Sequence, residues 1–580
     1  MHRTLSSFLA FGLPFLLGYG VLPLPHFINE MAAGLGLGLL LVVAAPELAA
    51  MRPGRAWWMA MGSLGVLLGL VGLQAWHSPV IGAGELYVFD AAYLVAAGLA
   101  FHLGFACGRT PQEREAWLYR VLACVAVAAV VAALAGLAQY FRLPLPGGLV
   151  PGLITPGRAY GFLRQPNHQA VFLALGLVAL LALDAGGRWS RAWVRLCAMV
   201  VGAGVLAAGS RLGAGLLVVV LVGGSLLLGR GTRRLAFELC LAWSGVLAAM
   251  VWFHVQMDMP FHGAEKVRQT LGEGWGMRPR IWRETVAMIM QAPWLGVGLH
   301  RYAPWFLLGE GAQSVGLPMS HAHQLILQLA FDVGVPAALL VSLTIARLLW
   351  GARRAVRQPP VAAAWGVVGI LLLHSMVEFP LWYLHFLTMF AFMMGVLARA
   401  DGWPAGAAMT LPHQPLPAMA IRSLLVGAGV LAAVFALWLN HDFYRVSPLF
   451  TPAGRLMSQA RDQAPDVTWF SRYVRYAELA ARPLDQRSAE DYWNGMAAIA
   501  CLMPDPLYTS QTVIALAYLG RLDEALRLLD LHVRLNESKL PVLREQLRRH
   551  EGPAFEQLLE FLDHPHAVAL PPQRLLPCLQ

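Results

Sequence analysis

Two histidines, His321 and His323, stand at the start of an apolar stretch, SHAHQLILQLAFDVGV (320–335), which has the composition of a membrane span. Ionisable side chains at the edge of a bilayer are energetically unfavourable, so they usually serve a function rather than packing. An imidazole is the side chain best suited to accept a proton near neutral pH. The pair therefore favours proton-transfer chemistry, although an isolated interfacial histidine more often binds lipid headgroups or starts a helix.

Four other connections between apolar runs contain polar residues that suit chemistry. They place Arg164, Gln165 and Asn167 in RAYGFLRQPNHQA (158–170), Arg211 in GSRLG (209–213), Arg278 and Arg280 in the segment 277–302, and Glu378 in HSMVEFPLWY (374–383). Arginine stays charged in a low-dielectric site and binds phosphate through a planar fork of donors. We therefore predict one polar cavity in which a phosphate or pyrophosphate leaving group is displaced.

Each of these residues also has a purely structural interpretation. Asn167 is a suitable helix cap, and the long stem of Arg211 lets its charge reach the membrane interface. Glu378 lies at a turn interrupted by proline, where solvent can surround it. Singly, these simpler interpretations are favoured. Jointly, polar residues from four connections on one side of the membrane favour a shared cavity, so the prediction depends on the topology.

Composition identifies the class of protein. The chain has 580 residues, of which 58% are hydrophobic and 13% charged, and its mean hydropathy is +0.57. Apolar runs of about 20 residues, the length that crosses a bilayer as a helix, recur up to residue 440. We predict an all-α polytopic membrane protein with about 13 transmembrane helices in residues 1–440. A soluble helical domain is expected in residues 441–580.

The basic residues, nearly all arginine, predict which side faces the cytoplasm. The net charge is +10, and arginines concentrate in five connections that alternate with arginine-poor ones: 51–55, 108–120, 186–195, 230–234 and 352–357. With the N-terminus inside, all five lie in the cytoplasm, as the positive-inside rule requires. The polar connections, the long loop 256–320 and the C-terminal domain are then periplasmic, in a protein of the bacterial inner membrane.

The segment 277–302 within the long loop has helical periodicity. One helical face carries Ile281, Trp282, Thr285, Met288 and Ile289. Arginines flank this face. The pattern predicts a helix that lies in the membrane interface, either beside the cavity or only as a membrane anchor.

The C-terminal domain contains TVIALAYLGRLDEALRLLDLHVRL (512–535), which resembles one tetratricopeptide hairpin. The small and aromatic packing positions of that repeat are occupied by Ala515, Tyr518, Gly520, Ala525 and Leu528. Such hairpins often bind proteins, although a domain that only stabilises the membrane body is an equal alternative. Cys501 and Cys578 share this domain, and we predict that they form a disulfide in the oxidising periplasm.

Five segments together resemble a known family. They are RQPNH (164–168), GSRLG (209–213), RPRIWRETVAMIMQAPWLGVG (278–298), HAHQLILQLAFDVGVP (321–336) and HSMVEFPLWY (374–383). In this order they resemble the bacterial O-oligosaccharyltransferase and O-antigen ligase superfamily, which includes O-antigen polymerases, and most closely its protein-glycosylating, PglL-like branch. The ligase motif of that superfamily is a His, then Asn, Ser or Gln, nine residues, a Gly, two residues and a small or hydroxyl residue. It maps to His323, Gln324, Gly334 and Ala337, where Ala337 departs from the usual Gly, Thr or Tyr.

The resemblance implies an activity and residue roles. Such enzymes transfer an oligosaccharide from undecaprenyl pyrophosphate to Ser or Thr hydroxyls of periplasmic or pilin-type proteins. Carried over, His323 is the base, with His321 and Glu378 as further catalytic residues. The substrate-binding residues are Arg211, Arg280, Arg278, Arg164, Gln165, Asn167 and Gln324, and the resemblance does not separate Arg278 from Arg280 as the pyrophosphate ligand.

Several alternatives stay open at this point. Within the same class, the chain is an O-antigen ligase that uses lipid A core as acceptor, or an O-antigen polymerase. A transporter of lipid-linked glycans is a different class, but its polar residues are expected near the bilayer midplane. A non-catalytic scaffold would not need the histidine pair. The sequence has no Cys/His metal spacing, Walker loop or Gly-x-Ser-x-Gly elbow, so we expect no cofactor, no metal and no nucleic-acid partner.

Overall fold

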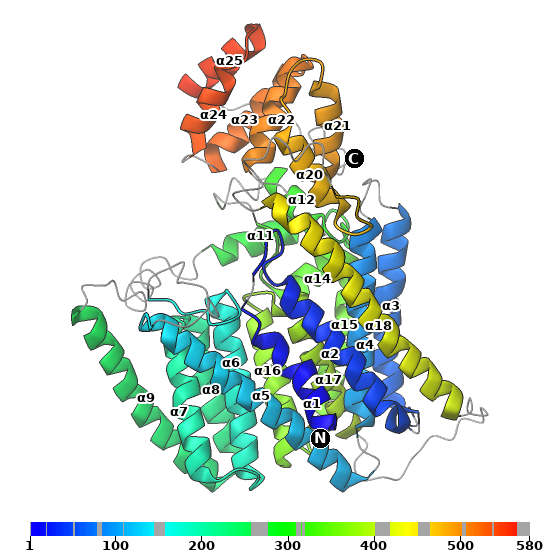
Figure 1. The fold of residues 1–580 in the computed structure, drawn as a ribbon, viewed down its shortest axis with the longest axis vertical. Helices are drawn as coiled ribbons and strands as arrows, with labels where there is room; N and C mark the ends of the chain where they lie inside the picture. The colour runs from blue at the N-terminus through cyan, green and yellow to red at the C-terminus, as the bar shows by residue number, and fades with distance from the viewer. Residues whose placement is uncertain are drawn as a thin grey trace. The chain divides into compact units, whose positions relative to one another are not determined.

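The computed structural model describes the chain except for residues 1, 19, 50, 52, 78–83, 108–109, 144–156, 257–276, 309–314, 316–318, 401–417, 451–464, 501–505, 536–538 and 565–580. All regular elements in the described part are helices (Figure 1). The chain forms two compact units. Unit 1 comprises residues 1–65, 92–274 and 341–440, and unit 2 comprises residues 66–91, 275–340 and 441–580.

Eight described helices are long and apolar enough to cross a bilayer. They are α2 (Phe27–Leu48), α3 (Arg55–His77), α4 (Gly84–Ala106), α5 (Pro111–Tyr140), α6 (Pro166–Ala185), α9 (Arg230–Gln256), α15 (Val335–Ala352) and α18 (Ala418–Val446). Shorter apolar helices are α8 (Arg211–Leu227), α16 (Pro359–Ser375) and α17 (Leu384–Ala400). The chain is therefore an all-α, multi-pass membrane protein, as predicted, while the expected number of 13 spans is not confirmed.

Two expected spans are interrupted. The N-terminal apolar run forms only α1 (His2–Phe11) and the 3-10 helix η1 (Leu13–Phe15). Pro14 lies in that short helix, and proline cannot donate a backbone hydrogen bond. The Asn29 amide donates to the carbonyls of Pro14 at 2.7 Å and Leu17 at 3.0 Å, which satisfies backbone oxygens that the helix leaves open. The expected span 321–350 is likewise divided, into α14 (Leu325–Val333) and α15.

Helix α6 is the centre of unit 1 and is buried over nearly its whole length. It packs against α5, α7 (Arg191–Ala207), α8 and α16. Small residues allow this close packing: a Cβ added at Gly176 would lie 2.1 Å from the Cβ of Ala129. The polar residues at the two ends of α6 are therefore held at defined positions within unit 1.

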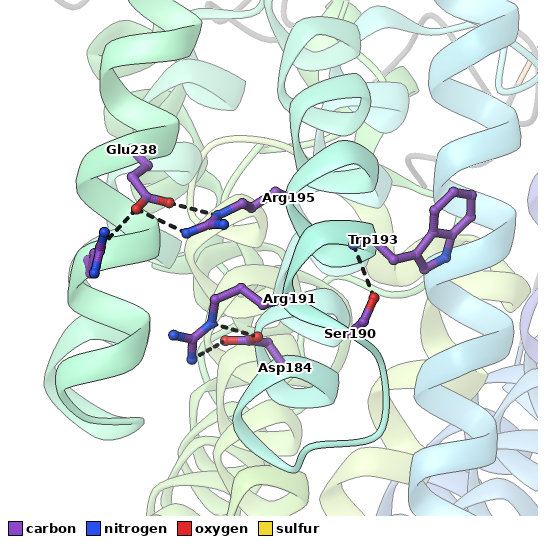
Figure 2. A network of polar contacts seen from close by, with 7 residues as sticks. Asp184, Ser190, Arg191, Trp193, Arg195 and Glu238 are labelled. Carbon is purple, nitrogen blue, oxygen red and sulfur yellow. Dashed lines mark hydrogen bonds and ion pairs between the residues drawn. The ribbon is translucent and has the colours of Figure 1, made fainter.

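The end of α6 carries an ion-pair network that Figure 2 shows. Arg191 donates to both carboxylate oxygens of Asp184, at 3.2 and 3.4 Å. Arg195 donates to both oxygens of Glu238, at 2.8 and 3.1 Å, and Arg234 donates to the same carboxylate at 3.1 Å. These arginines come from two of the arginine-rich connections predicted to face the cytoplasm, and here carboxylates balance them.

Unit 2 contains the second group of polar residues. Its helices include α11 (Arg278–Ile289), α12 (Tyr302–Leu308) and α14, which pack around Phe306 and Phe331, both fully buried. The predicted apolar face of α11 is buried at Ile281, Thr285, Met288 and Ile289. The predicted helix is confirmed, and the structure packs its apolar face within unit 2, whereas its place in a membrane interface stays a prediction.

The C-terminal part of unit 2 is helical, with α20 (Ser471–Ala481), α21 (Ala489–Ala500), α22 (Pro506–Tyr518), α23 (Leu522–Leu535), α24 (Leu540–Leu547) and α25 (Pro553–Asp563). Helices α22 and α23 lie side by side as a hairpin (Figure 1), with Gly520 at a φ of 69° in the turn. Ala515 and Ala525 are fully buried where the repeat pattern places small residues. Cys501 and Cys578 lie outside the described residues, and the domain boundary at residue 440 stays a prediction.

Candidate functional site

The histidine pair lies in a short loop just before α14, not within a helix. His321 Nδ1 is 2.9 Å from the hydroxyl of Ser320. Ala322, which lies between the two histidines in the sequence, is fully buried. His323 has a φ of 51°, the left-handed region that residues with a Cβ rarely adopt. Strained backbone of this kind persists only where the surroundings hold it, and it concentrates at functional sites.

Gln324 follows the histidines and is the N-cap of α14. Its side-chain oxygen accepts from the Leu327 amide at 2.5 Å. This contact satisfies one of the open backbone donors at the helix start. The cap also defines where the helix begins, so His323 is the last residue before a rigid element.

The two arginines of unit 2 stand in the first turn of α11, at Arg278 and Arg280. No acidic residue occurs in that turn. The positive end of the helix dipole and the arginine charges therefore add up at one point, an arrangement that favours an anion there. Arg280 is exposed and Arg278 half-buried.

In unit 1, the start of α6 forms the polar node made by Asn167, Ser210 and Glu378. Gln165 is the N-cap residue of α6, so Asn167 does not cap that helix. The Asn167 amide donates to Glu378 Oε1 at 3.0 Å, and its side-chain oxygen accepts from the Ser210 hydroxyl at 2.9 Å. Glu378 is 7% exposed, so it is buried rather than solvated at its turn.

Arg211 directly follows Ser210 and is the first residue of α8. Ser210 caps that helix by accepting from the Gly213 amide at 3.1 Å, and Arg211 is exposed. Helix α8 has no acid in its first turn, so it repeats the arrangement of α11. Arg164 is placed differently, because its guanidinium donates to the carbonyl of Gly20 at 3.0 Å.

The predicted residues thus fall into two groups. Unit 1 brings together Asn167 and Glu378, with Arg211 adjoining them in sequence through Ser210. Unit 2 brings together His321, His323 and Gln324 at the start of α14.

Comparisons with known proteins can now be placed on this geometry. A protein glycosylation ligase model matches residues 159–183, an O-antigen ligase model matches 196–342, and the C-terminal model of a virulence factor membrane-bound polymerase matches 362–532. In these parts the chain is similar to O-antigen ligases and protein glycosylation ligases. A general O-oligosaccharyltransferase of Acinetobacter baylyi is 23% identical over 382 residues, which cover 62% of this chain and 63% of that protein. The chain therefore spans a little under two thirds of the length of this relative.

The glycine of the superfamily's ligase motif has a physical reason in this chain. Gly334 ends α14 with a φ of 85°, and a Cβ added there would lie 2.2 Å from the carbonyl oxygen of Trp294. The same two segments are joined by backbone hydrogen bonds from Val297 to Phe331, at 2.7 Å, and from Val335 to Pro293, at 2.8 Å. Only glycine fits this close approach.

Around His168 of the RQPNH segment, the structure places three residues of unit 1 that sequence reasoning did not single out. His26, Tyr383 and His385 surround His168: the Tyr383 ring centroid lies 4.6 Å from that of His168 and 4.7 Å from that of His26. His168 and His385 are fully buried, and their ring nitrogens have no hydrogen-bond partner among the described residues. No group of three or more possible metal ligands was found in the described part of the chain. Histidines within apolar helices were the available signal.

A histidine of unit 2 was also missed. His300 has a φ of 61°, and its Nε2 lies 2.7 Å from Asp90 Oδ2. The preceding amide, that of Leu299, donates to the Gln74 side chain at 3.0 Å. Asp90 and Gln74 come from α4 and α3, far from His300 in the sequence, so no local pattern indicated these contacts.

Proposed function

We propose that this chain transfers an oligosaccharide from undecaprenyl pyrophosphate to Ser or Thr hydroxyls of periplasmic proteins such as pilins. The chain would act in the bacterial inner membrane with its site facing the periplasm. The observation that carries the proposal is His323, which the protein keeps in a strained conformation directly before a capped helix. Its position in the ligase motif of the superfamily supports the same role.

The proposed chemistry is a displacement at the first sugar of the donor. His323 takes the proton of the acceptor hydroxyl while the hydroxyl oxygen forms a bond to the anomeric carbon. The bond from that carbon to the pyrophosphate oxygen breaks, and lipid pyrophosphate leaves with the bonding electrons. A positioned base of this kind contributes about 10² to 10⁴ in rate.

Arginines at two helix starts support binding of the pyrophosphate. Arg211 begins α8, and Arg278 and Arg280 lie in the first turn of α11, with no acid in either turn. A helix start already favours anions through its dipole and open amides, and an arginine adds charge-assisted hydrogen bonds. Arg164, Gln165, Asn167 and Gln324 are proposed to support the donor site, and His321 and Glu378 to support catalysis.

One observation favours a second candidate for the acceptor. The match to a membrane-bound polymerase model over residues 362–532 supports transfer to a growing glycan. The match to a protein glycosylation ligase model over 159–183 and the relative named a general O-oligosaccharyltransferase support a protein acceptor. We favour the protein, because the helical hairpin α22–α23 has the form of a protein-binding repeat.

The test is a transfer assay with purified protein and a glycan linked to undecaprenyl pyrophosphate. A Ser-containing pilin-like protein, lipid A core and a second lipid-linked glycan are offered as separate acceptors. Wild-type protein should glycosylate the pilin-like protein and keep its activity in EDTA. Transfer only to lipid A core would refute the protein acceptor and indicate an O-antigen ligase. Transfer only to the second glycan would indicate a polymerase.

His323→Ala is the decisive variant. It should reduce transfer by about 10² to 10⁴ while donor binding stays near wild type, because the base acts on the acceptor hydroxyl. His77→Ala removes an exposed histidine at the end of α3 and is the matched control, with no expected loss. Full activity of His323→Ala would refute the role of this residue as the base.

A further inference from the structure

The backbone between the two histidines is held by a side chain of α14. The Ala322 amide donates to Gln328 Oε1 at 2.7 Å, and both residues are buried. Gln328 in turn donates from Nε2 to Asp332 Oδ1 at 3.0 Å. Gln328 and Asp332 are four residues apart, so they share one face of α14.

Asp332 is itself anchored at the end of α14. Its backbone oxygen accepts from the Gln74 side chain at 2.7 Å. The neighbouring Phe331 carbonyl accepts from Val297, and a Cβ at Gly296 would lie 2.6 Å from the Asp332 carbonyl carbon. The carboxylate therefore has a defined place from which it orients Gln328.

Gln328 has both of its polar atoms engaged and is only 4% exposed. The buried Gln328 amide has one favourable orientation. A flip would place its NH₂ group against the Ala322 N–H and its oxygen against the Asp332 carboxylate. The Ala322 amide is thus held from a rigid helix, one residue before the left-handed backbone of His323. Without the hydrogen bond between Ala322 and Gln328, the backbone at His323 could relax to more favourable angles.

We propose that Gln328 and Asp332 are positioning residues, which keep the 321–323 backbone in the conformation that presents His323 for proton transfer. The proposal rests on the proposed function, since it gives this pair a role in the same reaction. Neither residue touches the reacting atoms. The pair acts through the hydrogen bond to Ala322, and Asp332 acts one step further away, through Gln328.

The kinetic test uses Gln328→Met, which has a similar length and no hydrogen-bonding amide. Its kcat for transfer should fall about tenfold to hundredfold, the usual effect of a small displacement of a catalytic group, while the donor KM stays within about twofold of wild type. Asp332→Asn keeps an oxygen for Gln328 and should stay within about threefold of wild type. Asp332→Leu removes that oxygen and should lower kcat as well.

A matched control separates positioning from a general loss of stability. Asp442→Ala removes other hydrogen bonds of a buried side chain in unit 2, those that the Asp442 carboxylate accepts from the Thr468 and Trp469 amides at 2.9 and 3.0 Å. It should lower the Tm and leave kcat unchanged. An equal loss of kcat in Asp442→Ala and Gln328→Met would overturn the proposal, as would equal effects of Asp332→Asn and Asp332→Leu.

Hydrogen–deuterium exchange of the Ala322 amide tests the contact without any assay of activity. In Gln328→Met this amide should exchange about fivefold faster or more, and in Asp332→Asn at the wild-type rate. Asp332→Leu serves if Gln328→Met does not fold. Unchanged exchange at Ala322 would overturn the proposal. If the wild-type protein transfers no glycan to any acceptor, the proposed function fails, whereas faster exchange in Gln328→Met still supports the restraint on the loop.

Discussion

The two ends of α6 both carry polar networks, but they are built differently. At the end of the helix, Asp184 is paired with Arg191, seven residues away, and neighbouring charges are balanced in the same manner (Figure 2). At its start, Asn167 contacts Ser210 and Glu378, which are 43 and 211 residues away. No ion pair is needed to explain the Asn167 contacts, since an amide supplies both a donor and an acceptor.

This difference separates a structural network from a candidate site. An arginine paired with a nearby carboxylate is satisfied and contributes mainly to local stability. The Asn167 node instead holds a buried carboxylate through a neutral amide and adjoins Arg211 at a helix start. The proposed function assigns the node to the donor site, and the following predictions test that assignment, beginning with the largest expected effect.

Substitutions of the arginines near the two ends of α6 should differ most in their effect on donor binding. Arg211→Ala should weaken binding of the lipid pyrophosphate donor by about tenfold to hundredfold, the value of a charge-assisted contact of roughly 1.5–3 kcal/mol. Arg211→Lys should recover only part of it if the contact is bidentate. Arg191→Ala is the matched control and should leave donor binding unchanged. A binding titration in detergent measures both, and equal losses would remove the distinction between the ends of α6.

Removing the central side chain of each network sharpens the comparison. Asn167→Leu deprives buried Glu378 of its amide donor, and Asp184→Leu breaks the pair with Arg191, so each should lower stability by about 1–3 kcal/mol. Only Asn167→Leu should also lower turnover, by about tenfold. Thermal unfolding and the transfer assay on the same samples separate the two effects. A similar loss of turnover in Asp184→Leu would indicate a shared structural role.

The charge of Glu378 is tested by an isosteric change. Glu378→Gln keeps an oxygen that accepts from Asn167, so the Tm should stay close to wild type. We expect turnover to fall by less than about tenfold, because the node keeps its geometry and loses only the carboxylate charge. Glu378→Leu removes both the carboxylate charge and the hydrogen bond to Asn167. Equal turnover in the two variants would show that the charge, rather than the contact, matters.

The stability of the protein in acid depends on His532. Burial lowers the pKa of His532 from 6.5 to about 4. Below pH 6.5 the unfolded chain binds a proton at residue 532 that the folded protein does not bind. The contribution of neutral His532 to the free energy of unfolding is therefore complete above pH 6.5 and is lost as the pH falls toward 4. From pH 7 to pH 5 the loss is about 2 kcal/mol. Thermal unfolding across this range should show it, and His532→Gln should flatten the profile; an unchanged slope would contradict the assignment.

Much of the fold followed from the sequence. Long apolar runs predicted the membrane helices, the periodicity at Ile281 and Met288 predicted the helix α11, and the repeat pattern predicted the hairpin α22–α23. The first run was wrong as a continuous span. Hydropathy adds up residues one by one, and it does not register that Pro14 interrupts a helix whose carbonyls Asn29 then satisfies.

The sequence by itself determined which residue types stand next to the helices: two histidines before α14, and arginines at the starts of α8 and α11. Only the tertiary structure decided their partners. It placed Glu378 against Asn167, Gln328 against Ala322, and Tyr383 against His168. The physical reason is that composition and helical period act over a few residues, whereas these contacts depend on how distant helices pack and on which side chain faces the other.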